Sequence, residues 1–173
     1  AMVIVAPQAN DAFVAAIDKN TGEVVWKTPC LGDVGYSTPV ILTLCGVDQA
    51  VMIGATPPPG LNTGSVNGIS LENGSVLWSY HGWECKIPIP YATALPDNRL
   101  FITGGYKAGS AMVQLNRDGD AFTVKELFKT EECGSQIQQP IFFQNHLYVN
   151  SNSNEREDGM MCLTLDGKIL WKT

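Results

Sequence analysis

The sequence predicts an all-β protein made of successive units with similar strand patterns. The segment Ala16–Trp26 returns in weaker form as Gly68–Trp78 and again as Met161–Trp171. Each unit holds short runs rich in Val, Ile, Leu and aromatic residues, separated by Gly, Asn, Asp and Pro, which is typical of strands and turns. No window shows a sustained helical period. The first expectation is therefore a repeat of antiparallel strands.

A second marker recurs at nearly the same interval. Pro39, Pro90 and Pro140 each open an apolar run, and a strand beginning or an edge strand tolerates a residue that cannot donate to a ladder. Phe128 takes the place of the tryptophan that the third unit lacks. Four strands in a unit of roughly 40–50 residues are typical of a β-propeller blade. We therefore predict a β-propeller of four-stranded antiparallel blades.

The expected strands are assigned unit by unit. In the first unit they are Met2–Val5, Phe13–Ile17 and Val24–Lys27, and the inner strand is missing. The second unit is expected to hold Tyr36–Leu42, Ala50–Ala55, Ser65–Leu71 and Val76–Tyr80. The third holds Ile89–Ala94, Leu100–Thr103, Ala111–Leu115 and Val124–Lys129, and the fourth Gln139–Phe143, Leu147–Asn150, Met160–Leu165 and Ile169–Lys172. The blades then cover residues 1–28, 36–80, 88–130 and 138–173 of one domain.

A tight hairpin joins the third and fourth strands of each predicted blade. Gly22, Gly74 and Gly167 supply the positive φ that such a turn needs at little cost. The tryptophan four residues after each of these glycines is expected to pack between neighbouring blades. In the third unit five extra residues follow Asp118-Gly119 before Phe128, which predicts a longer outer hairpin.

The spacing of these residues resembles the tryptophan-docking motif of the quinoprotein-type β-propellers. Ala16, Asp18, Thr21, Gly22 and Trp26 match the motif fully, and its core recurs at Gly74 with Trp78 and at Gly167 with Trp171. The family contains eight-bladed dehydrogenases that use pyrroloquinoline quinone and non-catalytic bacterial relatives, such as the outer-membrane assembly lipoprotein of the BAM complex. The resemblance spans essentially the whole chain. It implies a propeller fold and export to the periplasm, whereas the motif itself is structural and implies no activity.

The resemblance also implies a ring of seven or eight blades, and the 173 residues of this chain are about half of what such a ring needs. Two interpretations follow: the chain is a fragment of a longer propeller, which the abrupt end at Thr173 favours, or two copies complete one ring. The net charge is −6 without a basic run, which argues against a nucleic-acid partner. No apolar stretch reaches the roughly 18 residues of a transmembrane helix.

The segments that connect consecutive blades are expected to lie on one face, around the mouth of the central channel. Three of the five cysteines, Cys30, Cys85 and Cys133, fall in these segments. Three interpretations stay open: a disulfide between Cys85 and Cys133, a soft-metal or redox site, and separate partly buried thiols. No Cys-x-x-Cys pair or histidine spacing supports zinc.

The segment 82–90 is the richest in chemistry, because it places Trp83, Glu84, Cys85 and Lys86 at the channel mouth. His81, in the same connection, is a separate candidate for ligand contact. Trp83 lies outside the docking position. It is expected either to stack on a planar ring or sugar of a ligand, or to cover the core of its own loop.

Further candidates for ligand contact come from the next connecting segment and from the inner strands. Glu132, Cys133 and Gln136 belong to the counterpart of segment 82–90 on the next blade. Tyr36, Gln136 and Gln138 would line the channel, in contact with a ligand or with water. The polar loop 150–158 offers a weak calcium site, because a hard cation prefers oxygen ligands. Its candidate ligands are Asn150, Asn152, Asn154, Glu155 and Asp158.

Two functions remain in competition. Quinoprotein dehydrogenases hold their cofactor with an adjacent Cys-Cys disulfide, a stacking Trp, calcium ligands and an Asp base. This chain has no adjacent cysteines and no acid matched to that base, and only Trp83 and Glu84 suggest such a site. The preferred hypothesis is a non-catalytic binding or scaffold propeller that presents loops to a protein, peptide or glycan. The alternative is a fragment of an alcohol or sugar dehydrogenase that uses pyrroloquinoline quinone and calcium.

Overall fold

The computed structural model describes residues 1–56, 65–153 and 156–173. Of residues 153 and 156–158 it describes the backbone alone. The described residues form an all-β structure of four antiparallel sheets without helices. The chain thus has the all-β class predicted from its sequence. Within these ranges, no helix has the length and apolar character needed to cross a bilayer.

The four sheets are numbered here in chain order. Sheet 1 consists of β1 (Met2–Val5), β2 (Ala15–Asp18) and β3 (Val24–Lys27). Sheet 2 consists of β4 (Val40–Leu44), β5 (Val47–Ile53), β6 (Val66–Ser70) and β7 (Val76–Tyr80). Sheet 3 consists of β8 (Thr93–Leu95), β9 (Arg99–Gly104), β10 (Gly109–Asp118) and β11 (Ala121–Thr130). Sheet 4 consists of β12 (Ile141–Phe143), β13 (His146–Ser153), β14 (Arg156–Thr164) and β15 (Ile169–Lys172).

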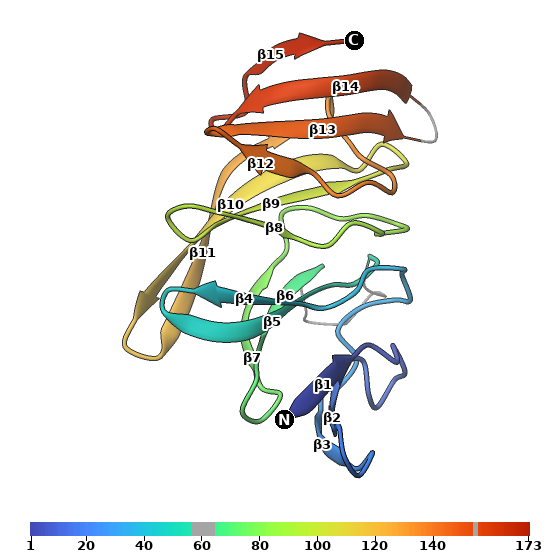
Figure 1. The fold of residues 1–173 in the computed structure, drawn as a ribbon, viewed down its shortest axis with the longest axis vertical. Coiled ribbons are helices and arrows are strands. Elements are labelled where there is room, and N and C mark those ends of the chain that lie inside the picture. The colour runs from blue at the N-terminus through green and yellow to red at the C-terminus, as the bar shows by residue number, and fades with distance from the viewer. Residues whose placement is uncertain (57–64, 154–155) are drawn as a thin grey trace.

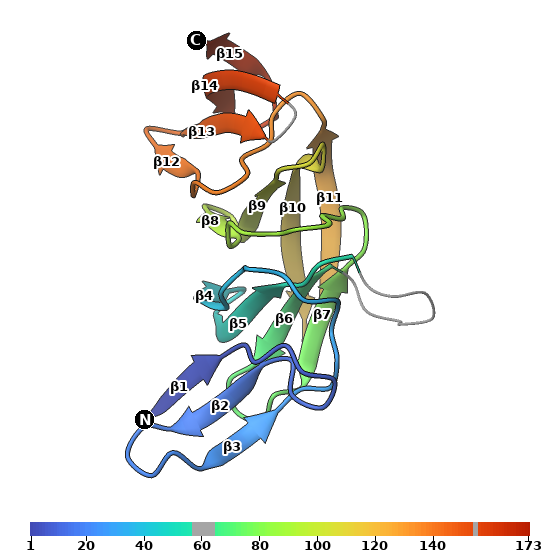
Figure 2. The ribbon, with the colours of Figure 1, turned by 90° about the vertical axis from the view of Figure 1, so that its right-hand side faces the viewer.

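The sheets follow one another along the long axis of the molecule, from sheet 1 near the bottom of Figure 1 to sheet 4 at the top. Within each sheet the spatial order of the strands is their order in the chain. The first strands of sheets 2 to 4, β4, β8 and β12, lie along one side, and β7 and β11 lie along the other (Figure 2). Each sheet is therefore a simple meander, and consecutive sheets are neighbours in space.

The inner strands begin later than the sequence suggested. The expected starts were Tyr36 and Ile89, whereas β4 begins at Val40 and β8 at Thr93. The residues before these strands bond to a neighbouring connection instead, because the backbone N–H of Tyr36 donates to the carbonyl of Pro88 at 2.9 Å. Proline residues at these strand beginnings also leave the ladder without a donor.

Sheet 3 has the longer outer hairpin that the sequence predicted. Strands β10 and β11 have ten residues each and pair through to Asp118 and Ala121, next to the turn. A bulge between Met112 and Val113 shifts their register. Figure 2 shows this hairpin extending past the edge of sheet 2, where β11 lies beside β7.

The hydrophobic core is divided into three layers, one in each gap between consecutive sheets. The layer between sheets 1 and 2 includes Phe13, Ala16, Trp26, Leu31, Ala50, Met52 and Ile69. The layer between sheets 2 and 3 includes Val51, Ile53, Trp78, Tyr80, Leu100, Ile102, Val113 and Leu115. The layer between sheets 3 and 4 includes Phe101, Met112, Leu147, Val149, Met161 and Leu163. Each sheet inside the series is thus covered on both faces.

The aromatic residue of each outer strand lies on the face toward the following sheet. The indole Nε1 of Trp26 donates to the carbonyl of Leu71 in the sheet 2 turn at 2.9 Å. A carbon added to Gly74 in that turn would lie 2.6 Å from Cε3 of Trp26. Phe128 of sheet 3 rests in the same way on Gly167 of sheet 4. A glycine in the next turn therefore makes room for the aromatic ring.

Trp78 packs differently, because the long hairpin of sheet 3 displaces the corresponding turn. No described atom lies within 4 Å of a carbon added to Gly119. Trp78 instead lies over Gly68 of its own sheet, and its Nε1 donates to Oε1 of Gln49 at 2.5 Å. The aromatic residue thus has the same position on the outer strand at each junction, but the group that it contacts differs.

Candidate binding surface

The segments that connect consecutive sheets lie together along the right-hand edge of Figure 1. They contain the residues that the sequence analysis proposed for ligand contact. His81, Glu84, Lys86 and Glu132 are exposed there, and Tyr36 is 76% exposed. These side chains are accessible to a partner.

Trp83 is placed inside the protein, 2% exposed. It belongs to the core between sheets 2 and 3, and Gly104 makes room for its ring beside the Cys85 thiol. Its backbone carbonyl accepts a hydrogen bond from the hydroxyl of Ser65. Of the two expectations for Trp83, the structure therefore favours a cover for the core of its own loop. A ring buried on all sides offers no face for stacking on a ligand.

No disulfide joins any of the five cysteines, so the one considered between Cys85 and Cys133 is not formed. The two residues are buried in different core layers, Cys85 between sheets 2 and 3 and Cys133 between sheets 3 and 4. Burial raises the pKa of the Cys85 thiol, which keeps it protonated at neutral pH. Both behave as small core residues.

Within the described residues, Trp83 does not fit the stacking role that the dehydrogenase alternative gives it. Trp83, the ring that would stack on the quinone, is buried, and Glu84 beside it is exposed. Within the described residues no three His, Cys, Asp or Glu side chains come together as ligands. Of the calcium candidates, Asn150 is half-buried and Asn152 exposed, whereas Asn154, Glu155 and the side chain of Asp158 lie outside the described residues.

Hydrogen bonds join three parts of the connecting segments, residues 34–38, 88–91 and 136–139. These three parts together are called the inner rim. The Tyr36 N–H bond to Pro88 links its first two parts. The Gln139 side chain links the last two, since its Oε1 accepts from Tyr91 N at 3.1 Å and its Nε2 donates to Tyr91 O at 2.9 Å. Gln8 makes the same pair of bonds with Gly35 N, at 2.6 Å, and O, at 3.0 Å. These amide clamps fix the backbone of the rim.

The inner rim exposes apolar side chains on this fixed backbone. The exposed apolar residues are Val34, Tyr36, Tyr91 and Ile137. Gln138 is exposed among them, and Gln136 donates to the hydroxyl of Tyr106 at 3.4 Å. A group of exposed apolar side chains on a hydrogen-bonded backbone is typical of a surface where a partner binds.

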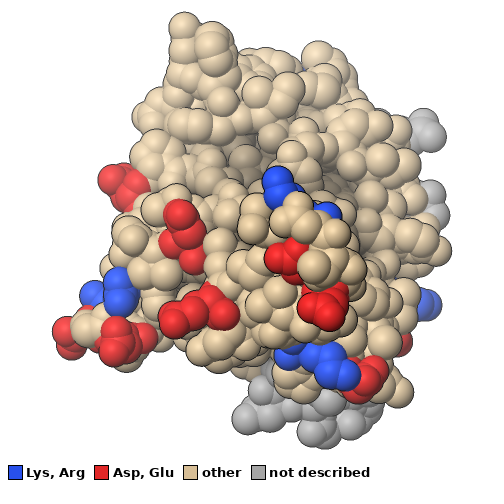
Figure 3. Space-filling view, turned by 60° about the horizontal axis from the view of Figure 1, so that its bottom comes forward, with Lys and Arg blue, Asp and Glu red and all other residues tan. Residues whose placement is uncertain are grey.

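The inner rim and the strands that follow it carry no charge. Residues 34–47, 87–96 and 133–147 contain no Asp, Glu, Lys or Arg, although the chain has 17 acidic and 11 basic residues. In Figure 3 charged side chains of both signs are confined to the lower part of the view, and the upper part shows none. The surface around β4, β8 and β12 therefore suits an uncharged ligand.

Sequence reasoning missed several of these residues. Val34, Tyr91, Ile137 and Gln139 were not among the predicted residues, because the side chains of segment 82–90 have the more varied chemistry. The signal that would have found them is the absence of charge from three equivalent segments. The bond from Tyr91 to Gln139 spans 48 residues, and no local pattern predicts it.

The opposite edge of the molecule has a polar hollow of about 440 Å³ between sheets 2 and 3. Its lining residues are Cys45, Asn98, Leu115, Asn116, Arg117 and Gly119. Asn98 joins the two sheets, since its Oδ1 accepts from Cys45 N at 2.7 Å and its carbonyl from Leu115 N at 3.0 Å.

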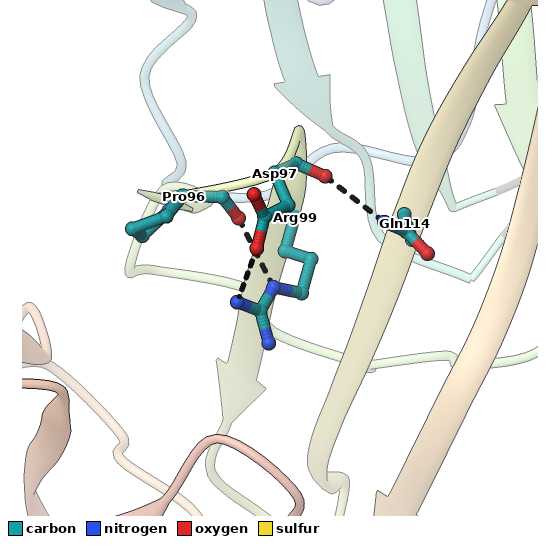
Figure 4. A network of polar contacts seen from close by, with 4 residues as sticks. All are labelled: Pro96, Asp97, Arg99 and Gln114. Atoms are coloured by element: carbon teal, nitrogen blue, oxygen red, sulfur yellow. Dashed lines mark hydrogen bonds and ion pairs between the residues drawn. The ribbon is translucent and has the colours of Figure 1, made fainter.

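The turn that links β8 to β9 ends at Asn98, and a network of polar contacts holds it. Arg99 bonds the carbonyl of Pro96 at 3.0 Å and the carboxylate of Asp97 at 2.9 Å, and Gln114 bonds the carbonyl of Asp97 (Figure 4). Asp97 and Asn98 both have positive φ. These bonds account for the stability of a strained turn, so we assign them a structural role.

Comparison with known protein families and with curated proteins finds no match for this chain. Its function is inferred from the placement of its own side chains.

Proposed function

We propose that the four sheets are consecutive blades of a β-propeller and that the chain is a non-catalytic binding scaffold. Its inner rim would hold an uncharged, apolar peptide segment of a protein partner. The observation that carries this proposal is the uncharged surface around β4, β8 and β12, with Val34, Tyr36, Tyr91 and Ile137 exposed on a hydrogen-bonded backbone. Serial four-stranded meanders with their first strands on one side support the propeller.

The chemistry of the rim distinguishes between classes of partner. Tyr36 and Tyr91 supply large contact area at a low cost in side-chain entropy, as aromatic residues do at binding surfaces. Val34 and Ile137 add aliphatic surface, which favours apolar peptide side chains over a sugar ring with its many hydroxyls. A charged segment would lose hydration here without gaining an opposite charge. An apolar peptide is therefore the preferred ligand class among protein, peptide and glycan.

The ends of the sheets offer backbone groups as well. Strands β4, β8 and β12 are each the terminal strand of a sheet, and a terminal strand can pair with an extended peptide. Affinity would come from this pairing and from the two tyrosines, and selectivity from the absence of charge.

Fluorescence anisotropy with short capped peptides tests the proposal. The probes are peptides of Thr, Gln and Val with one or two Phe or Leu, and matched peptides in which Gln is replaced by Glu or Lys. We expect the uncharged peptides to bind, and Tyr36→Ala or Tyr91→Ala to weaken binding by about tenfold or more, as at interface hot spots.

Leu127→Ala is the matched control, because Leu127 is an exposed apolar residue on β11, away from the rim. It should leave affinity unchanged. A preference for charged peptides, or equal loss in the rim variants and the control, would overturn the proposal.

A further inference from the structure

The two ends of the series of sheets expose the faces that are covered elsewhere. In sheet 4 the pairing places Ile141, Tyr148, Cys162 and Trp171 in one row across the strands. The rings of Tyr148 and Trp171 lie 6.1 Å apart. This row corresponds to Val40, Val51, Gly68 and Trp78 of sheet 2, which are covered by sheet 3.

The outer face of sheet 4 is apolar and hollowed. Ile141, Phe143, Met160 and Trp171 are exposed, and Trp171 is 46% exposed. A hollow of about 350 Å³ opens there, lined by Ile141, Tyr148 and Met160 together with the amide side chains of Gln138, Gln139 and Asn150. An exposed apolar face of this kind is typical of a protein contact.

Sheet 1 presents a turn of the form that receives a docking ring. Gly22 and Gly74 have the same φ of 76°. Gly22 N donates to Asp18 O at 2.9 Å, and Gly74 N donates to Ser70 O at 3.0 Å. Yet Gly74 is covered by Trp26, whereas no atom of the described residues lies within 4 Å of a carbon added to Gly22. Val3 and Val24 are exposed on the adjacent strands.

We infer that sheet 4 of one copy of this chain docks head to tail on sheet 1 of a second copy. Trp171 would rest on Gly22, as Trp26 rests on Gly74. Its Nε1 would donate to the carbonyl of Lys19, which stands three residues before Gly22 as Leu71 stands before Gly74. Val3 and Val24 would cover the hollow of sheet 4.

The molecule itself identifies the occupant. Inside the series, the face of a sheet that carries the docking aromatic is covered by the next sheet, with the turn glycine receiving the ring at two of the three junctions. Within the described residues, Trp171 is the docking aromatic that no sheet covers, and the turns at Gly22 and Gly119 receive no ring. Of these two turns, only that of Gly22 lies on an end sheet. Such a contact joins two different surfaces, so it is heterologous, and it forms either a closed ring of copies or a series.

Sedimentation velocity over a dilution series tests the inference. The wild type should sediment above its monomer mass of 18.7 kDa and shift toward the monomer on dilution. Trp171→Ala should lower the association constant by about tenfold or more, because it removes the central aromatic anchor. Leu127→Ala is the matched control, since Leu127 is an exposed apolar residue on β11 of sheet 3, away from both end faces. Circular dichroism checks that each variant is folded.

A mixing experiment distinguishes head-to-tail docking from a contact between two identical faces. Val24→Glu places a charge on the exposed outer face of sheet 1. Each variant, Trp171→Ala or Val24→Glu, keeps one intact docking face, so neither should self-associate but their mixture should form a one-to-one pair. A monomeric wild type, normal association of Trp171→Ala, or undiminished self-association of Val24→Glu would overturn the inference.

Discussion

Trp26 and Trp171 occupy the same position in the repeat and have opposite environments. Trp26 is 7% exposed, with its ring on Gly74 and its indole N–H bonded to Leu71 of the next sheet. Trp171 is 46% exposed, because none of the four described sheets covers its face. Each strand determines the face on which its aromatic residue lies, whereas burial depends on the neighbouring sheet. The end faces therefore carry the same kind of aromatic residue as the interior junctions.

Interior junctions also have polar contacts between their outer strands. The hydroxyl of Tyr80 on β7 donates to the carboxylate of Glu126 on β11. Nζ of Lys129 on β11 donates to the carbonyl of Gly82 at 2.9 Å. These bonds join sheets 2 and 3, and their loss can be measured separately from the loss of apolar contact.

Replacing Trp78 or Trp171 by alanine should give the largest difference in stability between an interior junction and an end face. Trp78→Ala opens a cavity between sheets 2 and 3 and leaves Oε1 of the buried Gln49 without its donor. We expect a loss of about 3–5 kcal/mol in the free energy of unfolding. For Trp171→Ala in the dilute monomer we expect less than about 1 kcal/mol, as for other surface positions. Urea denaturation measures both, and equal losses would contradict the assigned environments.

Gly74→Ala and Gly22→Ala isolate the space that a docking ring needs. Both substitutions place alanine at the same positive φ, which costs about 1–2 kcal/mol in either turn. Only at Gly74 does the new methyl group meet Trp26, so overpacking should add about 1–3 kcal/mol to that variant. Thermal or urea unfolding of the dilute chain measures the difference. If the two variants lose the same stability, Trp26 does not depend on this glycine.

The bond between Tyr80 and Glu126 should make an interior junction sensitive to alkali. Burial, and then the hydrogen bond to Glu126 and its negative charge, raise the pKa of Tyr80. The folded state therefore favours the neutral phenol. The resulting stability is complete below pH of about 10, the value for an unfolded tyrosine, and declines by about 1 kcal/mol per pH unit above it.

Tyr80→Phe removes this titration and is the control. Urea unfolding at pH values from 9 to 11 should show a steeper decline in the wild type than in the variant. Parallel declines would mean that Tyr80 is not protected by the junction.

Replacing Asp18 in the turn of sheet 1 should have the smallest effect on the free energy of unfolding. The carboxylate of Asp18 accepts from the backbone N–H groups of Asn20, at 2.8 Å, and Thr21, at 3.1 Å, which lowers its pKa. Its contribution to stability is present above the pKa of an unfolded aspartate, about 3.9, and is lost as the pH falls through the folded value. Unfolding of the wild type and Asp18→Asn should therefore converge in acid. Constant separation of the two curves would contradict the turn geometry.

The strand pattern could be predicted from the sequence because it depends on local features. The repeat, the turn glycines and the extra residues before Phe128 gave the all-β class, the approximate strand positions and the long hairpin of sheet 3. The late starts of the inner strands could not be predicted. They depend on bonds such as Tyr36 to Pro88, which join segments far apart in the chain.

The candidate site was predicted less well, because composition does not determine burial. Trp83 and Cys85 have functional chemistry, but the room that Gly104 leaves places both in the core. Tyr91 and Gln139 have unremarkable local sequences, and only the packing of sheets 3 and 4 brings them together. Tyr36 was among the predicted residues and its ring is exposed, although it precedes the strand β4 that it was expected to open.

Hydrogen exchange of the four tryptophan indole N–H groups tests the serial docking most directly. Assigned ¹⁵N–¹H spectra would be recorded at a concentration where the chain sediments as a monomer. We predict slow exchange for Trp26 and Trp78, whose indoles are buried and bonded, and for the buried Trp83. Trp171 should exchange rapidly and become protected only as the chain associates. A protected Trp171 in the monomer, or a Trp26 that exchanges as fast as Trp171, would contradict the account.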